Sequence, residues 1–166
     1  MASKESSFDV VSQVDMQEVD NAFQQARKEL SQRYDLKDAD AEIELDKQKH
    51  EMTVVAPSDF VAGQVIDIIN AKLIKRGIDI AAVKWGNPTD VSGGRVKRCG
   101  QIVSGIDEDT LKKINKELKS LKMKIKVQIE GDKLRVSSAS RDTLQDVIAH
   151  LKQQDYGIPL QYTNYR

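Results

Sequence analysis

The sequence lacks the residue patterns of several classes of protein. Its single cysteine, Cys99, excludes an internal disulfide and a Cys-rich zinc site. No apolar run approaches the ~20 residues that a membrane helix needs. The opening segment MASKESS has no apolar core of the kind found in secretion signals. We therefore expect a soluble protein of the reducing cytoplasm, with no membrane partner.

Signals of catalysis are also scarce. No glycine-rich run ends in Lys-Ser or Lys-Thr, so there is no P-loop, and no serine or cysteine stands in a nucleophile motif. The histidines, His50 and His150, have no close metal-ligand neighbour in the sequence. Asp107-Glu108-Asp109 resembles an acidic metal site, but carboxylates at a helix start satisfy free amides and the helix dipole. We expect no enzyme, no metal and no cofactor.

An internal repeat organises the chain. The segment Lys124–Leu151 combines alternating apolar residues, a Gly131-Asp132 turn and a helix capped by Ser140, which predicts a hairpin followed by an amphipathic helix. The same pattern occurs 82 positions earlier without a gap, so that Ile43 falls on Ile125. The chain is therefore interpreted as a duplication, with residues 1–94 and 95–166 as the two repeats. Residues 86–94, rich in glycine, are the predicted linker.

Each repeat has the order strand, helix, strand, strand, helix, strand. The predicted strands are residues 8–14, 42–45, 52–56, 78–85, 96–103, 125–129, 134–136 and 160–164, and the predicted helices are residues 15–33, 58–76, 107–122 and 140–151. This order predicts the fold class α+β, with two tandem ferredoxin-like domains. Each would have an antiparallel four-stranded sheet with two helices on one face and an open opposite face, which can bind a ligand or pack on the other repeat.

The RNA-recognition motif shares this fold and must be considered. It stacks bases on aromatic residues of its central strands. The corresponding strands here, EMTVVA and KLRVSS, contain no aromatic residue, and the ribonucleoprotein signature is absent. The chain is therefore not an RNA-recognition motif of the usual kind.

The formal net charge of zero conceals an asymmetry. Residues 1–60 contain 7 Lys and Arg against 14 Asp and Glu, whereas residues 95–130 contain 10 against 5. A basic segment can bind an anion, or the basic and acidic segments can face each other.

Four basic sites are candidates for anion binding. Lys75 and Arg76 end a predicted helix, where cations also complement the dipole. Arg95, Lys97 and Arg98 lie where the linker becomes a strand, and they can clamp a phosphate or form a solvated edge. Three lysines share one face of helix 107–122, where a solvated face is the default: Lys112, Lys116 and Lys119. At the end of the sequence Tyr162 and Tyr165 with Arg166 offer stacking beside a cation, although Tyr162 also suits a core position.

Four segments together resemble the YajQ family of bacterial proteins. They are SFDVVSQVD (Ser7–Asp15), Lys75-Arg76-Gly77-Ile78, LKMKIKVQIEGDKLRV (Leu121–Val136) and the final PLQYTNYR (Pro159–Arg166). The resemblance implies two ferredoxin-like domains that exchange their first strands, so that strand 8–14 joins the second sheet and strand 96–103 the first. It also implies a protein without established catalytic activity that binds nucleoside triphosphates such as GTP or ATP, RNA or cyclic di-GMP, with a protein partner in transcription regulation.

The sequence departs from the family pattern after the second hairpin. Members place Gly and Lys before the helix, whereas Ser138 and Ala139 stand here, which removes a cation from that corner. Residues 95–105 also diverge. Our leading hypothesis is a regulatory protein that binds a nucleotide or nucleic acid, with Lys75, Arg76, Arg95, Lys97, Arg98, Tyr165 and Arg166 as candidate contacts. The alternative is a protein-interaction scaffold that uses an open sheet face or the lysine-rich helix 107–122.

Overall fold

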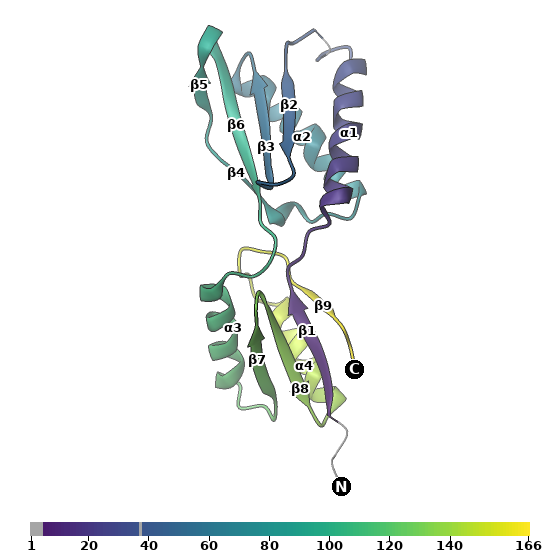
Figure 1. The fold of residues 1–166 in the computed structure, drawn as a ribbon, viewed down its shortest axis with the longest axis vertical. Helices are drawn as coiled ribbons and strands as arrows, with labels where there is room; N and C mark the ends of the chain where they lie inside the picture. Colours follow the sequence, from purple (N-terminus) through teal and green to yellow (C-terminus); the bar gives the residue numbers. More distant parts are fainter. Residues whose placement is uncertain (1–4, 37) are drawn as a thin grey trace. The chain divides into compact units, whose positions relative to one another are not determined.

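The computed structural model describes residues 5–36 and 38–166. Its strands are β1 (Ser6–Val11), β2 (Glu42–Asp46), β3 (Glu51–Ala56), β4 (Val83–Trp85), β5 (Thr89–Val91), β6 (Arg95–Ile102), β7 (Lys126–Glu130), β8 (Lys133–Ser138) and β9 (Gln161–Thr163). Its α-helices are α1 (Met16–Gln32), α2 (Asp59–Lys75), α3 (Glu108–Ser120) and α4 (Arg141–Lys152), with short 3₁₀ turns at Ile80–Ala82 and Ser92–Gly94 (Figure 1).

These elements form two compact units. The first, here called the split unit, combines the segment that ends at Gln13 with Ser104–Arg166, and the second, the central unit, is Val14–Val103. In the split unit the sheet has the order β7-β8-β1-β9, and in the central unit the order is β2-β3-β6-β4, with β5 added beside β6. Every strand pair is antiparallel, and the order is that of a ferredoxin-like sheet.

The first strand of each repeat lies in the sheet of the other repeat's hairpin. Strand β1 pairs with β8, Phe8 opposite Val136, and with β9, Val10 opposite Tyr162. Strand β6 pairs with β3, Val54 opposite Arg98, and with β4. The fold class predicted from the sequence is confirmed, including the exchange of first strands. The division into residues 1–94 and 95–166 describes the sequence repeat and stays a prediction. The two compact units do not follow it, because each contains residues from both repeats.

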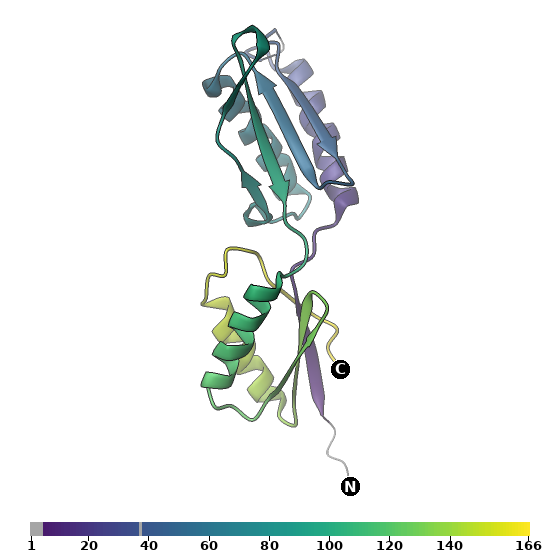
Figure 2. The same cartoon turned by 60° about the vertical axis from the view of Figure 1, so that its left-hand side comes forward.

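Each unit has its own hydrophobic core between its sheet and its two helices. In the central unit α1 and α2 cover one sheet face (Figure 1; Figure 2), and Phe23, Met52 and Ile69 are among the buried residues between the layers. In the split unit α3 and α4 supply Ile114 and Val147 to the core beneath the sheet. In both cases the opposite sheet face carries polar side chains, because side chains alternate between the two faces of a strand.

Capping side chains set where the helices begin. Asp15 accepts hydrogen bonds from the amides of Gln17 and Glu18 at the start of α1. Ser58 and Ser140 accept one bond each, from the third residues of α2 and α4. Asp107 accepts from both the amide and the hydroxyl of Thr110, and these bonds lower its pKa. The acidic run at residues 107–109 therefore has the structural role that its position predicts.

Two segments differ from the sequence prediction. Only Val83–Trp85 of the strand predicted at residues 78–85 is a strand, because the Asp79 carboxylate accepts a bond from the amide of Ala81 and stabilises a 3₁₀ turn over residues 80–82. Within residues 86–94, predicted as the linker, strand β5 pairs with β6, and Gly93 and Gly94 take positive φ angles of 80° and 72° in the turn between them.

Candidate functional site

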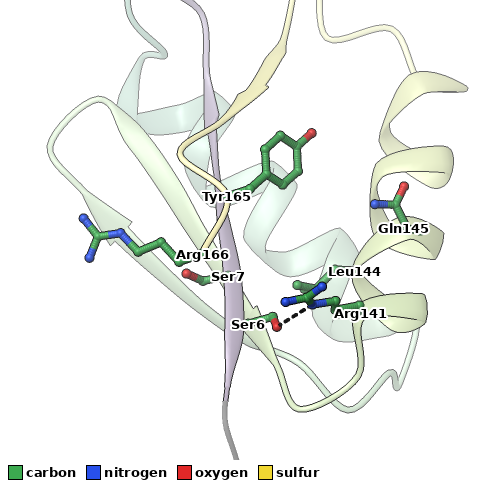
Figure 3. A pocket seen from close by; sticks show the side chains of 7 residues that line it. All are labelled: Ser6, Ser7, Arg141, Leu144, Gln145, Tyr165 and Arg166. Atoms are coloured by element: carbon green, nitrogen blue, oxygen red, sulfur yellow. Dashed lines mark hydrogen bonds between the residues drawn. The ribbon is translucent and has the colours of Figure 1, made fainter.

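A pocket in the split unit brings together parts of the chain that are distant in sequence. It has a volume of about 310 Å³ and is lined by Ser6, Ser7, Arg141, Leu144, Gln145, Tyr165 and Arg166 (Figure 3). The lining comes from β1, from the first turns of α4 and from the segment after β9. The volume lies at the small end of the range for ligand pockets in proteins.

Phe8 supports one wall of this pocket. Its ring is fully buried on the helix side of β1, and its centroid lies 6.1 Å from that of Tyr165. The ring of Tyr162 meets Phe8 edge-on, also at 6.1 Å. Tyr165 itself is 61% exposed. An aromatic ring that is packed against another ring yet largely exposed can stack on a planar ligand.

Arg141 supplies positive charge beside the aromatic wall. It is the first residue of α4, and its Nε donates a hydrogen bond to Ser6 Oγ over 3.4 Å. Free amides at a helix start also carry partial positive charge. Asp142, in the same turn, is exposed, and its negative charge would repel an anion. Anion binding here would therefore depend on the guanidinium group of Arg141.

Leu144 and Gln145 complete the α4 side of the pocket. Leu144 is buried and forms an apolar surface, whereas Gln145 is exposed and faces the side on which Tyr165 lies (Figure 3). An amide side chain both donates and accepts hydrogen bonds, so Gln145 can contact a polar edge of a planar ligand.

Tyr165 and Arg166, which the sequence paired as a stacking ring with a cation, extend to opposite sides of β1. The amide and carbonyl of Arg166 exchange hydrogen bonds with those of Ser7 at 3.0 and 3.2 Å. The Arg166 and Ser7 side chains lie on the other side of β1 from Tyr165 and Arg141 (Figure 3). The cation on the same side of β1 as Tyr165 is therefore Arg141, which was not among the residues predicted from the sequence, and not Arg166. The position of Arg141 directly after the capping Ser140 was the available signal, since it marks the start of a helix.

The basic cluster on β6 is also divided between two faces. Lys97 and Arg95 border a cavity of about 340 Å³ on the open face of the central sheet, together with Glu42 and Glu44. Arg98 lies on the helix side, where its Nε donates a hydrogen bond to the Gly86 carbonyl at 3.0 Å. Lys97 and Arg98 therefore do not grip one phosphate together, because consecutive strand residues point to opposite faces.

Arg95 and Arg98 already have partners among the described residues. Arg95 donates a hydrogen bond to the Asp40 carbonyl over 2.7 Å, and Arg98 lies 4.0 Å from the carboxylate of Asp59. These contacts, and the glutamates beside Lys97, reduce the positive charge available to an anion on this face.

Lys75 and Arg76 lie at the C-terminal end of α2, in the central unit. Arg76 is 3.6 Å from the Glu18 carboxylate, and Lys75 is exposed in the last helical turn. Gly77 follows with a φ of 78° and ends the helix. Neither cation lines the pocket beside Tyr165.

His150 belongs to a hydrogen-bonded cluster on the surface of the split unit. His150 Nε2 lies 3.0 Å from Glu117 Oε1, and the Tyr156 hydroxyl donates to the other oxygen at 2.8 Å. Burial, and then the bond to Glu117, raise the pKa of Tyr156, so the phenol stays protonated. Over residues 5–36 and 38–166, no group of three or more His, Cys, Asp or Glu side chains is arranged to hold a metal ion.

The family model described as "Nucleotide-binding protein YajQ-like" matches residues 6–166. The chain belongs to this family. Relatives named "Nucleotide-binding protein" include one from Enterococcus faecalis, 45% identical over the whole of both chains, and one from Desulfitobacterium hafniense, 44% identical over 99% of both. A third, from Chloroherpeton thalassium, is 43% identical over 96% of this chain and 97% of its own. The resemblance stated from four sequence segments is thereby confirmed. No helix in the described part of the chain is long and apolar enough to cross a membrane.

Proposed function

We propose that this chain is a non-enzymatic nucleotide-binding protein and that the nucleotide occupies the Tyr165–Arg141 pocket. The observation that carries this proposal is the combination, in one cavity, of an exposed aromatic ring, a guanidinium group and an amide side chain. A nucleotide has three matching parts, namely a planar base, a base edge with hydrogen-bonding groups and a phosphate. The family description and the names of the relatives support the same class of ligand.

In the proposed complex the base stacks on the exposed face of Tyr165 and contacts the Gln145 amide with its polar edge. The phosphate lies at the start of α4, beside Arg141. Ala139 provides no cation at this corner, and Arg141 supplies the charge from two residues further along. Stacking contributes about 1–3 kcal/mol per base, so Tyr165 is the residue on which affinity should depend most.

Within this proposal the ligand is a nucleoside triphosphate, cyclic di-GMP or the end of an RNA strand, and binding regulates a partner in transcription. A pocket of about 310 Å³ accommodates one nucleotide unit at a time. The proposed compartment is the cytoplasm, where a lone thiol such as Cys99 stays reduced.

Isothermal titration with GTP, ATP, cyclic di-GMP and a short single-stranded RNA, each at two salt concentrations, tests the proposal. Saturable binding of at least one ligand is expected, and it should weaken about tenfold or more in Tyr165→Ala and in Arg141→Gln. Tyr165→Phe keeps the ring and should bind nearly as tightly as the unmodified chain. No saturable binding of any ligand would remove the proposal.

The matched control for Arg141→Gln is Lys97→Gln, which removes one positive charge from the β6 site. It should leave affinity unchanged. If Lys97→Gln weakens binding while Arg141→Gln does not, the nucleotide binds on the central sheet and the proposed location is wrong. Thermal melting of each variant separates loss of binding from loss of folding, since Tyr165 also contacts Phe8.

A further inference from the structure

The two repeats place corresponding strands at the edges of their sheets. Strand β2 is the outermost strand of the central sheet on the side of β3, and β7 is outermost in the split unit on the side of β8. No other strand of the described chain pairs with the outer side of either. Each edge therefore presents backbone N–H and C=O groups that can pair with another strand.

Acidic side chains of the first hairpin fall on basic or neutral side chains at the equivalent positions of the second hairpin. The 82-residue offset places Glu42 on Lys124, Glu44 on Lys126, Asp46 on Gln128 and Glu51 on Lys133, so each acidic residue of one hairpin corresponds to a basic or neutral residue of the other. Between them the apolar positions are kept, with Ile43 on Ile125 and Leu45 on Val127. The core-facing pattern is thus conserved between the repeats, while the open face reverses its charge.

The charged groups at the two edges are available to a partner. Glu42, Glu44, Lys124 and Lys126 are all exposed, and within the described residues none of them is part of an ion pair. Lys133 and Arg135, by contrast, are paired with Asp9. Residues two apart on a strand lie on one face about 7 Å from each other. An antiparallel approach therefore sets Glu42 opposite Lys126 of β7 and brings Glu44 near Lys124, two residues before that strand.

We propose that the chain associates with a second copy of itself by pairing β2 of one copy with β7 of the other. Main-chain hydrogen bonds between edge strands supply affinity, and the opposite charges select this pairing over β2 with β2 or β7 with β7. The partner is a second copy of this chain because each chain has one acidic edge, β2, and one basic edge, β7, so that every β2 edge has a matching β7 edge. Such a contact joins two different surfaces, so it closes into a ring or continues from copy to copy.

Sedimentation velocity over a range of protein concentrations at low and high salt tests this proposal. The average mass of the unmodified chain should rise with concentration, and less so at high salt. The double variants Glu42→Lys/Glu44→Lys and Lys124→Glu/Lys126→Glu should each associate about tenfold or more weakly alone, since like charges then face each other. An equimolar mixture of the two variants should associate again, because one has two basic edges and the other has two acidic edges.

The control is Lys116→Glu/Lys119→Glu, which makes the same charge change at exposed positions of α3 and should associate like the unmodified chain. The proposal is overturned if the unmodified chain stays monomeric, if the mixture fails to associate, or if the control loses association equally. It is also overturned if Lys124→Glu/Lys126→Glu abolishes binding of a single-stranded RNA and has no effect on mass, since the basic edge would then be a nucleic-acid surface. Tyr165→Ala should associate normally, so the outcome is independent of the nucleotide proposal.

Discussion

Arg135 Nε donates a hydrogen bond to Asp9 Oδ1 over 3.1 Å. The two residues, which are 126 positions apart in the sequence, form an ion pair. Lys133 Nζ and Asn164 Nδ2 donate to the other oxygen over 3.3 and 2.9 Å. Three elements, β8, β1 and the segment after β9, therefore meet at one buried carboxylate. This contact exists because the first strand of the chain lies in the sheet of the split unit.

Replacing Asp9 by Asn should lower the free energy of unfolding of the split unit by about 2 kcal/mol, because hydrogen bonds to a charged group are lost. Urea unfolding followed by circular dichroism measures this. Asp90→Asn, an exposed change in β5, is the control and should stay within about 0.5 kcal/mol of the unmodified chain. Equal stability of the two variants would show that the Asp9 ion pairs contribute nothing.

The same carboxylate predicts a pH dependence. Burial alone would raise the pKa of Asp9, but hydrogen bonds from Asn164, Arg135 and Lys133 outweigh burial and lower it. A pKa lower in the folded than in the unfolded state means that the stabilisation is complete above the usual carboxyl pKa of about 4 and is lost as the pH falls through the lowered value. Unfolding measured between neutral pH and about pH 2 should therefore be less pH-dependent in Asp9→Asn. An unchanged dependence would contradict the prediction.

Phe8→Ala should destabilise the split unit by about 3–5 kcal/mol, because it leaves a cavity beside Tyr162 and Tyr165. The central unit should be affected much less, and its single tryptophan, Trp85, reports on it separately. Hydrogen exchange in β8 and α4 should accelerate while the Trp85 fluorescence transition stays near its original midpoint. Phe60→Ala, at a 76% exposed position, is the control. A Trp85 transition that shifts as far as the exchange rates would contradict the assignment of Phe8 to the split unit.

A contrast between two glycines tests packing in the central unit. A Cβ at Gly100 would lie 2.9 Å from the ring of Trp85, whereas one at Gly63, inside α2, meets nothing within 4 Å. Gly100→Ala should therefore cost about 1–3 kcal/mol, since the indole must move. Gly63→Ala should raise stability by up to about 1 kcal/mol through helix propensity. Thermal unfolding monitored by Trp85 fluorescence measures both, and equal effects of the two changes would be inconsistent with this packing.

The two faces of β6 give a further prediction. Arg98→Ala removes the hydrogen bond to Gly86 and should cost about 1 kcal/mol of stability. Lys97→Ala, on the open face, should change stability by less than about 0.5 kcal/mol. Urea denaturation of both variants checks this, and equal losses would indicate that the residues share one environment.

Much of the fold follows from local patterns in the sequence. The alternation at residues 125–136, the caps at Asp15 and Ser140 and the repeat of the hairpin predicted the elements close to where they lie. Strand exchange was implied only by the resemblance, because nothing in the composition of residues 8–14 says which sheet they join. Strand β5 was missed since its three residues stand among turn-forming glycines.

The candidate site was less predictable because a pocket depends on contacts between distant residues. Tyr165, a candidate contact predicted from the sequence, lines a pocket, whereas Arg141 stands 24 positions earlier and becomes its neighbour only through β1. Lys97 and Arg98 are adjacent in the sequence and were therefore predicted to act together. Adjacent residues of a strand, however, point to opposite faces of the sheet.

Chemical-shift mapping of the isotope-labelled chain, titrated with GTP and then with cyclic di-GMP, locates the nucleotide that we propose beside Tyr165 and Arg141. We expect saturable shifts at the backbone amides of Ser6, Ser7, Gln145 and Tyr165, with little change along β6. Shifts concentrated on Arg95–Ile102, with none around Tyr165, would contradict it.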